Sequence, residues 1–257
     1  MGGEVEVTMK SKIMLRLTMF ESKLFLRNFI NIFFLLVFPT LMILLFGGIY
    51  GNTPNEVYGG AGMVDVSVPA YAGMIISVTG LMSLPLTICE YREKKVLKRY
   101  MATPIKPVYV IVSQICVNTF MTITGMALLI VVAKLVFNLK FTGNVLEVAI
   151  VFLLSIFSIF SIGFLIASIA PNMKAAGAIA NLIYFPMLFL TGATVPIEIM
   201  PDFMQRISKI LPVTHVVEAM KHVWLGDGIF TCWQSILVLI GVMIGCFALS
   251  IKFFRWE

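Results

Sequence analysis

Apolar residues dominate this chain in long, nearly uncharged stretches. Six stretches of at least 23 residues contain no Asp, Glu, Lys or Arg. A helix needs about 20 apolar residues to cross the hydrocarbon layer of a membrane. Because the stretches are continuously apolar and do not alternate, they predict helices and exclude a β-barrel. The predicted spans run near residues 29–49, 68–88, 109–137, 147–170, 176–195 and 232–252.

The composition supports an all-α membrane protein. Hydrophobic residues make up 60% of the chain and charged residues only 12%, whereas a soluble domain carries about 25% charged residues. The net charge of +6 sits at helix ends, which indicates membrane topology and no nucleic-acid partner. The basic N-terminal segment is too long, and lacks the cleavage site, for a signal peptide. The four cysteines have no metal-type or paired spacing, and no cofactor is predicted.

The distribution of Lys and Arg predicts the orientation. Five of these residues precede the first span, six follow the second span, and three more fall on the same side, against five on the opposite side. Basic residues accumulate on the cytoplasmic side of membrane proteins. We therefore expect a multi-pass protein of the plasma membrane with both termini in the cytoplasm.

An amphipathic helix is predicted before the first span, at residues 9–27. Ile13, Leu17, Phe20 and Leu24 repeat with helical spacing beside a stripe of basic residues. This pattern is typical of a helix that lies in the membrane interface. The pattern fits a simple topology anchor and a partner-binding helix equally well.

The connection after the second span is a second amphipathic segment, at residues 90–104. Mixed charges open it, and Thr103-Pro104 ends it because a residue before proline avoids the helical region. Its apolar positions are Val96, Leu97, Tyr100 and Met101. Such a helix can insert into a groove of a partner, although the pattern alone favours a charged loop that only fixes topology.

The segment between the last two spans is divided by prolines. Pro196, Pro201 and Pro212 leave two helical pieces too short to cross a membrane, and Gly226 stands where a helix cap belongs. Phe203, Ile207 and Ile210 share one face of the first piece, and Val217, Met220 and Trp224 share one face of the second. Residues 197–226 are therefore expected to form a re-entrant hairpin.

These last two segments together resemble the ABC-2 type permease family. After its second span the family carries a glutamate followed by G-T-L-E-R-L-x-x-T-P, and Glu93, Leu97, Arg99, Thr103 and Pro104 stand in the matching places. Lys95 replaces the usual glycine and Lys98 the usual glutamate. After span five the family pattern is matched by Gly192, Pro196, Pro201, Leu211, Pro212, Thr214, Glu218, Ala219 and Lys221.

The resemblance implies the permease half of an ATP-driven exporter. Two permeases would associate in the lipid membrane, and each would dock a cytoplasmic ATPase through the coupling helix at residues 90–104. The coupling residues would be Glu93, Val96, Leu97, Arg99, Tyr100, Met101, Thr103 and Pro104. The dipeptide Gly-Lys occurs nowhere, so a Walker A phosphate loop is absent and the ATPase is expected on another chain. The permease itself is therefore not expected to be an enzyme.

Two further residue sets carry weaker hypotheses. Asn181, Tyr184, Phe185 and Met187 of span five are candidates for the transport pathway, with ordinary helix packing as the stronger alternative. His215, Glu218 and His222 share one stripe that could bind Zn²⁺ but more simply faces outward as a polar surface. An ATP-independent channel or secondary transporter, and a membrane scaffold without transport, remain the competing functions. The sequence does not identify a substrate.

Overall fold

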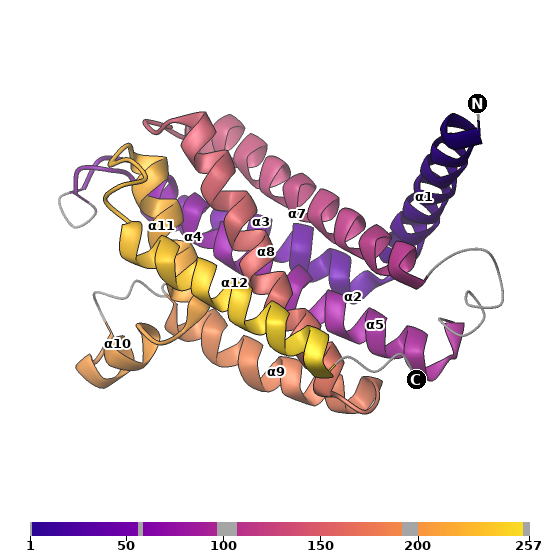
Figure 1. Ribbon diagram of the computed structural model, residues 1–257. Helices are drawn as coiled ribbons and strands as arrows, with labels where there is room; N and C mark the ends of the chain where they lie inside the picture. Colours follow the sequence, from indigo (N-terminus) through magenta and orange to yellow (C-terminus); the bar gives the residue numbers. More distant parts are fainter. Residues whose placement is uncertain (1, 56–58, 97–106, 192–199, 254–257) are drawn as a thin grey trace.

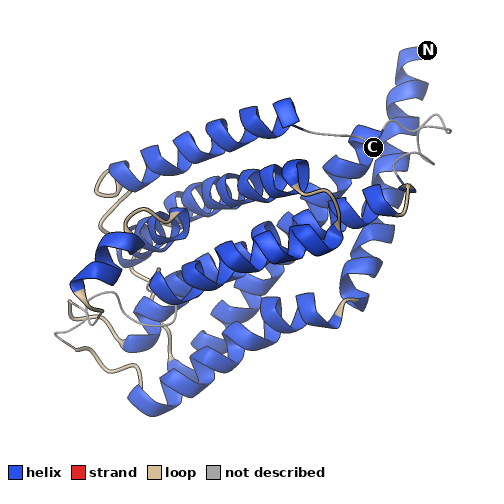
Figure 2. Ribbon diagram, turned by 90° about the horizontal axis from the view of Figure 1, so that it is seen from below, coloured by secondary structure: helices blue, strands red, loops and turns tan. Residues whose placement is uncertain are grey.

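The structure is a bundle of long helices (Figures 1 and 2). It is a computed structural model that describes residues 2–55, 59–96, 107–191 and 200–253, and no strand occurs within these ranges. Six of its helices are long and apolar enough to cross a membrane: Phe29–Tyr50, Met63–Glu93, Tyr109–Phe137, Val145–Ile169, Met173–Leu190 and Trp233–Phe253. The all-α, six-span fold class predicted from the sequence is confirmed.

Two of these helices contain a π-helical turn. The first consists of α2 (Phe29–Ile32), the π-turn η1 (Phe33–Val37) and α3 (Phe38–Tyr50). The second consists of α4 (Met63–Ser77), the π-turn η3 (Val78–Ser83) and α5 (Leu84–Glu93). The other four are α7 (Pro107–Phe137), α8 (Val145–Ile169), α9 (Met173–Leu190) and α12 (Trp233–Phe253).

The second spanning helix is longer than the predicted 68–88. It reaches Glu93, so residues 90–93 form its last turn and do not begin a separate coupling helix. The charged residues there terminate the apolar run but do not interrupt the helix, because Glu and Arg are good helix formers. Residues 97–106, the rest of the predicted coupling segment, lie outside the described residues.

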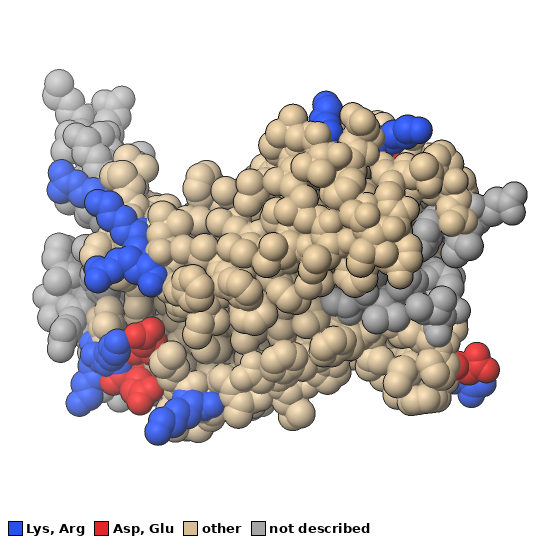
Figure 3. Space-filling model, turned by 180° about the vertical axis from the view of Figure 1, so that it is seen from behind, with Lys and Arg blue, Asp and Glu red and all other residues tan. Residues whose placement is uncertain are grey.

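Charged side chains collect at one end of the bundle. This basic end carries α1 (Gly2–Arg27), the end of α5 and the end of α12 (Figure 1). In Figure 3, Lys and Arg gather there together with Asp and Glu, and a wide belt without charge follows. An uncharged belt between polar ends is the surface expected of a protein that crosses a lipid bilayer.

The second spanning helix forms the centre of the bundle. In its most apolar window 83% of the residues are buried, against 11% in α12. It contacts α8 very closely: a Cβ atom on Gly163 of α8 would lie 2.0 Å from the carbonyl oxygen of Gly80 in η3. Glycine at both positions therefore allows the two backbones to touch.

Helix α1 packs differently from the predicted amphipathic pattern. It includes the predicted residues 9–27, and Leu17 is buried as expected, but Phe20 and Leu24 are exposed. Leu17, Glu21 and Phe25 are the buried positions, and α1 packs against α7. These three positions are four residues apart, as one face of a helix requires. Because the middle one is a glutamate, a search for apolar positions did not find this face.

The last connection contains two short helices, α10 (Asp202–Ser208) and α11 (Pro212–Leu225). Gly226 ends α11 with a φ of 95°, as a C-terminal cap requires. Val217, Met220 and Trp224 of α11 are buried, and α11 packs against α4 and α12. The three apolar residues predicted to share a face of the first short helix are all exposed, and Ile210 lies beyond the end of α10. Neither helix is long enough to span a membrane.

Candidate functional site

Three consecutive residues at the end of α5 bind three different parts of the bundle. Tyr91, Arg92 and Glu93 contact α1, α8 and α9 respectively. We call these three residues the α5 junction. They lie at the start of residues 90–104, the segment that the sequence analysis predicts to be the coupling helix.

The first contact joins α5 to α1. The hydroxyl of Tyr91 donates a hydrogen bond to Oε2 of Glu21 at 2.5 Å, and the side-chain amide of Gln114 on α7 donates to the same oxygen at 2.5 Å. Burial raises the pKa of the Glu21 carboxyl, and the hydrogen bonds from Tyr91 and Gln114 act in the opposite direction. Glu21 therefore connects three helices at the basic end.

The second contact closes the end of α8. The guanidinium of Arg92 donates to the carbonyl oxygen of Ala167 at 3.1 Å and also to that of Ala170. The last carbonyls of a helix have no partner within the helix and carry partial negative charge. A planar cation with several donors satisfies two of them at once.

The third contact reaches the start of α9. The side chain of Glu93 accepts a hydrogen bond of 3.3 Å from the backbone N–H of Met173, and a carboxylate at a helix N-terminus is stabilised by the helix dipole. Only residues 170–172 separate α8 from α9. Arg92 and Glu93 therefore hold this turn from its two sides.

A left-handed residue follows the junction. Lys95 has a φ of 56°, a conformation that glycine adopts without strain and other residues rarely adopt. Lys94 beside it pairs with Glu90 at 2.5 Å. The family pattern described above has glycine at position 95. The backbone at Lys95 therefore has the left-handed conformation that glycine favours, although the residue is a lysine.

Only the beginning of the predicted coupling set is described. Glu93 belongs to the α5 junction, and Val96 is half-buried. The other predicted coupling residues, Leu97, Arg99, Tyr100, Met101, Thr103 and Pro104, lie outside the described residues. The family motif identified Glu93, but nothing in the pattern indicated Tyr91 or Arg92 as contact residues.

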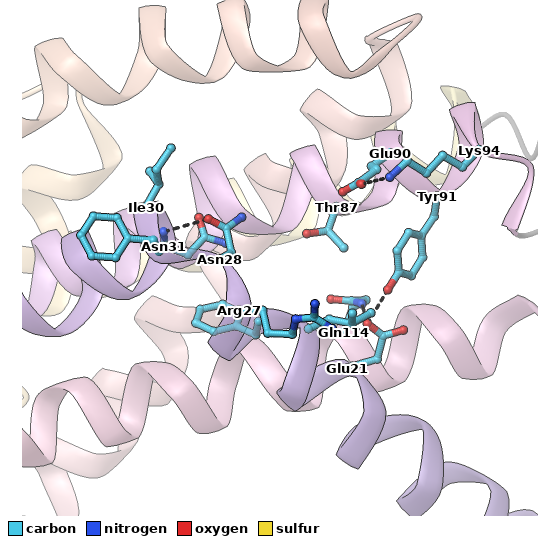
Figure 4. Close-up of a pocket in the computed structure, with 13 residues that line it drawn as sticks. Glu21, Arg27, Asn28, Ile30, Asn31, Thr87, Glu90, Tyr91, Lys94 and Gln114 are labelled. Carbon is cyan, nitrogen blue, oxygen red and sulfur yellow. Dashed lines mark hydrogen bonds and ion pairs between the residues drawn. The ribbon is translucent and has the colours of Figure 1, made fainter.

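A cavity of about 600 Å³, lined by both charged and apolar side chains, opens beside the α5 junction (Figure 4). Its walls come from α1, α2, α5 and α7, together with the connecting residue Asn28. Glu21, Arg27, Glu90 and Lys94 are its charged residues. Sequence analysis missed this cavity, because residues from four separate segments form it.

A column of buried polar residues continues from Gln114 into the bundle. Asn118 donates to the backbone of Gln114, Thr122 donates to that of Asn118, and the hydroxyls of Thr122 and Thr79 lie 2.8 Å apart. Gln114, Asn118 and Thr122 are four residues apart and therefore share one face of α7. Asn118 Oδ1 is buried without a hydrogen-bond partner in the described structure. The polar spacing within an apolar stretch is the signal that could have identified this column.

The four candidate pathway residues of α9 do not share one surface. Tyr184 and Met187 are buried within the bundle, whereas Asn181 and Phe185 are exposed. Asn181 and Phe185 are four residues apart and lie on the same outward side. The hydroxyl of Tyr184 has no partner among the described residues.

The hairpin residues that the structure describes fix the α10–α11 turn and its contact with α12. Pro212 occupies the first turn of α11, and Thr214 donates to the carbonyl of Ser208 at 2.6 Å. Glu218 accepts a hydrogen bond of 2.7 Å from Ser235 of α12. Pro201 precedes α10. Gly192 and Pro196 lie outside the described residues.

The two histidines of α11 have separate partners. His215 contacts Ser235 at 3.0 Å, and His222 contacts Asp227 at 2.8 Å. Within the described ranges no group of three or more His, Cys, Asp or Glu side chains is placed to hold a metal ion.

Comparison with known proteins defines the class. The profile of the ABC-2 type transporter family matches residues 14–225. The chain therefore belongs to the ABC-2 type transporter family, which confirms the resemblance found in its motifs.

Individual relatives agree with this assignment. The inner membrane transport permease YhhJ of Escherichia coli is 26% identical over 73% of this chain and 52% of its own length. The probable multidrug ABC transporter permease YbhS of the same bacterium is 22% identical over 63% of this chain and 43% of its own. Nodulation protein J of Rhizobium meliloti is 31% identical over 34% of this chain. The chain spans about half the length of the first two relatives.

Proposed function

We propose that this chain is the membrane subunit of an ATP-driven exporter that works with separate cytoplasmic ATPase subunits. It is an ABC-2 type permease with six membrane-length helices, and its relatives are transport permeases. The α5 junction is the observation that supports coupling most directly. It connects the end of the second span to α1, α8 and α9.

In this mechanism the ATPase displaces the segment after α5. Because Arg92 and Glu93 hold the turn between α8 and α9, that displacement moves two spans together. Tyr91 and Glu21 transmit it to α1 at the same time. Packed helices joined by hydrogen bonds move as rigid elements, and such elements couple distant sites.

A second copy of the chain completes the transport pathway in this proposal. The outward side of α9 carries a polar residue, Asn181, beside Leu182, Phe185 and Phe189. A polar amide is costly against lipid and is stabilised by a neighbouring helix. We therefore assign this side of α9 to the permease–permease contact.

Co-purification tests the proposal as a whole. The tagged chain, solubilised gently from its own membranes, is expected to bring down an ATPase subunit with a Walker A motif and vanadate-sensitive ATP hydrolysis. Asn181→Cys, in a background without the four native cysteines, is expected to cross-link two copies, while Gly245→Cys on α12 is not. Transport that persists without any ATP-hydrolysing subunit would support a channel instead.

A further inference from the structure

The cavity beside the α5 junction has a buried carboxylate without a counter-ion. Glu21 is 3% exposed, and its hydrogen bonds come from the neutral donors Tyr91 and Gln114. No Lys, Arg or His of the described chain forms an ion pair with it. Lys94, which lines the same cavity, is already paired with Glu90. A buried carboxylate is stabilised by a cation within hydrogen-bond distance.

A positive group lines the same cavity six residues further along α1. Arg27 is exposed and has no ion pair among the described residues. Six residues correspond to about 9 Å of helix, and a long side chain shortens this because helical side chains lean toward the N-terminus. The cavity therefore offers an acceptor for a cation and, on its rim, a donor for an anion.

Part of the rim of the cavity is apolar. Phe29 and Ile30, at the start of the first spanning helix, are 75% and 61% exposed and line the cavity. They follow Arg27, the last residue of α1, at the point where the first spanning helix begins. An occupant can therefore keep a polar group inside the cavity and hydrocarbon chains along these side chains.

We propose that this cavity binds the headgroup of an aminophospholipid, with the ammonium on Glu21 and the phosphodiester on Arg27. Figure 4 shows the two residues on the same side of the cavity. About 600 Å³ is ample for a headgroup, since small-molecule sites range from about 300 to 1,000 Å³. The inference requires insertion into a membrane but not export, so it stands apart from the proposed function.

A lipid bound here would touch the elements of the α5 junction. The donors of Glu21 come from α5 and α7, and Arg27 is the last residue of α1. The headgroup therefore contacts α1 at two positions, and its ammonium supplies the counter-ion that Glu21 lacks among the described residues. Lipid composition would then influence how firmly α1 is held against the bundle.

Native mass spectrometry of the purified full-length chain tests the site. The probes are dioleoyl phosphatidylethanolamine, phosphatidylcholine and phosphatidylglycerol, offered in equal amounts. Phosphatidylcholine cannot donate from its quaternary ammonium, and phosphatidylglycerol has no ammonium. We expect phosphatidylethanolamine to be retained at least about tenfold over either competitor. Equal retention of the three lipids by the wild-type chain overturns the proposal, whether or not any variant folds.

Variants separate the two contacts. Glu21→Gln keeps a side chain that can accept from Tyr91, and it is expected to reduce the preference for phosphatidylethanolamine to less than about twofold. Arg27→Gln is expected to weaken retention of all three lipids without changing their order. The double variant Glu90→Gln with Lys94→Gln removes the ion pair in the same cavity at unchanged net charge, and it is expected to keep the preference.

A single-chain amine distinguishes the lipid headgroup from a simple amphipathic cation. Dodecylammonium carries the ammonium but no phosphodiester, so it is expected to displace phosphatidylethanolamine only at much higher concentration. Displacement at equal concentration would exclude the contribution of Arg27 and overturn the headgroup assignment. Unchanged selectivity in Glu21→Gln would overturn it as well.

Discussion

The guanidinium of Arg92 donates a hydrogen bond of 3.1 Å to the carbonyl oxygen of Ala167, so the last turn of α5 closes the last turn of α8. The neighbouring Glu93 accepts from the backbone of Met173 at the start of α9. Two adjacent residues of α5 therefore form hydrogen bonds with both ends of the turn between α8 and α9. Arg92 also donates to a second carbonyl oxygen, that of Ala170.

Replacing Arg92 should destabilise the bundle. Arg92→Gln loses charge-assisted hydrogen bonds to the end of α8, which are worth about 1.5–3 kcal/mol in total. We expect a free energy of unfolding lowered by that order, measured by denaturant titration in detergent. Lys94→Gln, which breaks only the exposed pair with Glu90, should leave it unchanged. Equal effects of the two changes would contradict the structural role of Arg92.

Glycine at position 95 should stabilise the end of α5. Lys95 has a φ of 56°, which costs a residue with a Cβ about 1–2 kcal/mol. Lys95→Gly is expected to raise the free energy of unfolding by about 1 kcal/mol, since part of the gain is lost to unfolded-state entropy. Lys95→Ala keeps the Cβ and should give no gain. A gain of the same size in both variants would show that the charge, and not the backbone, is responsible.

The contact of η3 with α8 predicts a contrast between two helical glycines. Gly163→Ala places a Cβ 2.0 Å from the Gly80 carbonyl oxygen and should destabilise the bundle by about 1–3 kcal/mol. Gly177→Ala on α9 meets no atom within 4 Å and should be neutral or slightly stabilising. Thermal unfolding in detergent measures both. A Gly163→Ala variant as stable as wild type would mean that the two helices are not in backbone contact.

Much of the fold follows from apolar length alone. The six spans require only continuous hydrophobic runs, and the cap at Gly226 requires only a glycine after an amphipathic stretch. These features depend on local sequence, so they can be predicted from it. The left-handed conformation at Lys95 could not be predicted in this way, because lysine stands there in place of the glycine that usually indicates such a turn.

The functional contacts could not be predicted in the same way. Glu21, Tyr91 and Gln114 are far apart in the sequence and meet only because α1 packs against α7 beside the end of α5. A search for apolar faces on α1 also passes over Glu21, since a charged residue is expected to face water and is buried here only by the packing of the helices. Likewise, Asn181 and Tyr184 are only three residues apart on α9, yet Asn181 is exposed and Tyr184 is buried, so their closeness in sequence does not place them in one site.

Cysteine labelling should establish the orientation that the Lys and Arg distribution predicts. In a background without native cysteines, Asn55→Cys and Asp202→Cys are expected to react with a membrane-impermeant maleimide on intact cells. Lys94→Cys should react only after permeabilisation, because the basic end is expected in the cytoplasm. Reaction of Lys94→Cys on intact cells would reverse the orientation and remove the coupling proposal with it.

The coupling of a separate ATPase through the segment after α5 is tested most directly by Leu97→Asp combined with Tyr100→Asp. If a groove of the ATPase buries these two positions, losing their apolar contact removes about 1.5–3 kcal/mol each, and the new charges add a desolvation cost. Phe203→Asp with Ile210→Asp adds the same charge at two exposed positions, one in α10 and one between α10 and α11, and is the matched control. The measurement is the amount of ATPase subunit and vanadate-sensitive ATP hydrolysis that co-purifies per permease. We predict normal permease levels in the membrane for both variants. The control should keep an intact complex, whereas Leu97→Asp with Tyr100→Asp should lose the ATPase. Retention of full ATPase activity by Leu97→Asp with Tyr100→Asp would contradict the account.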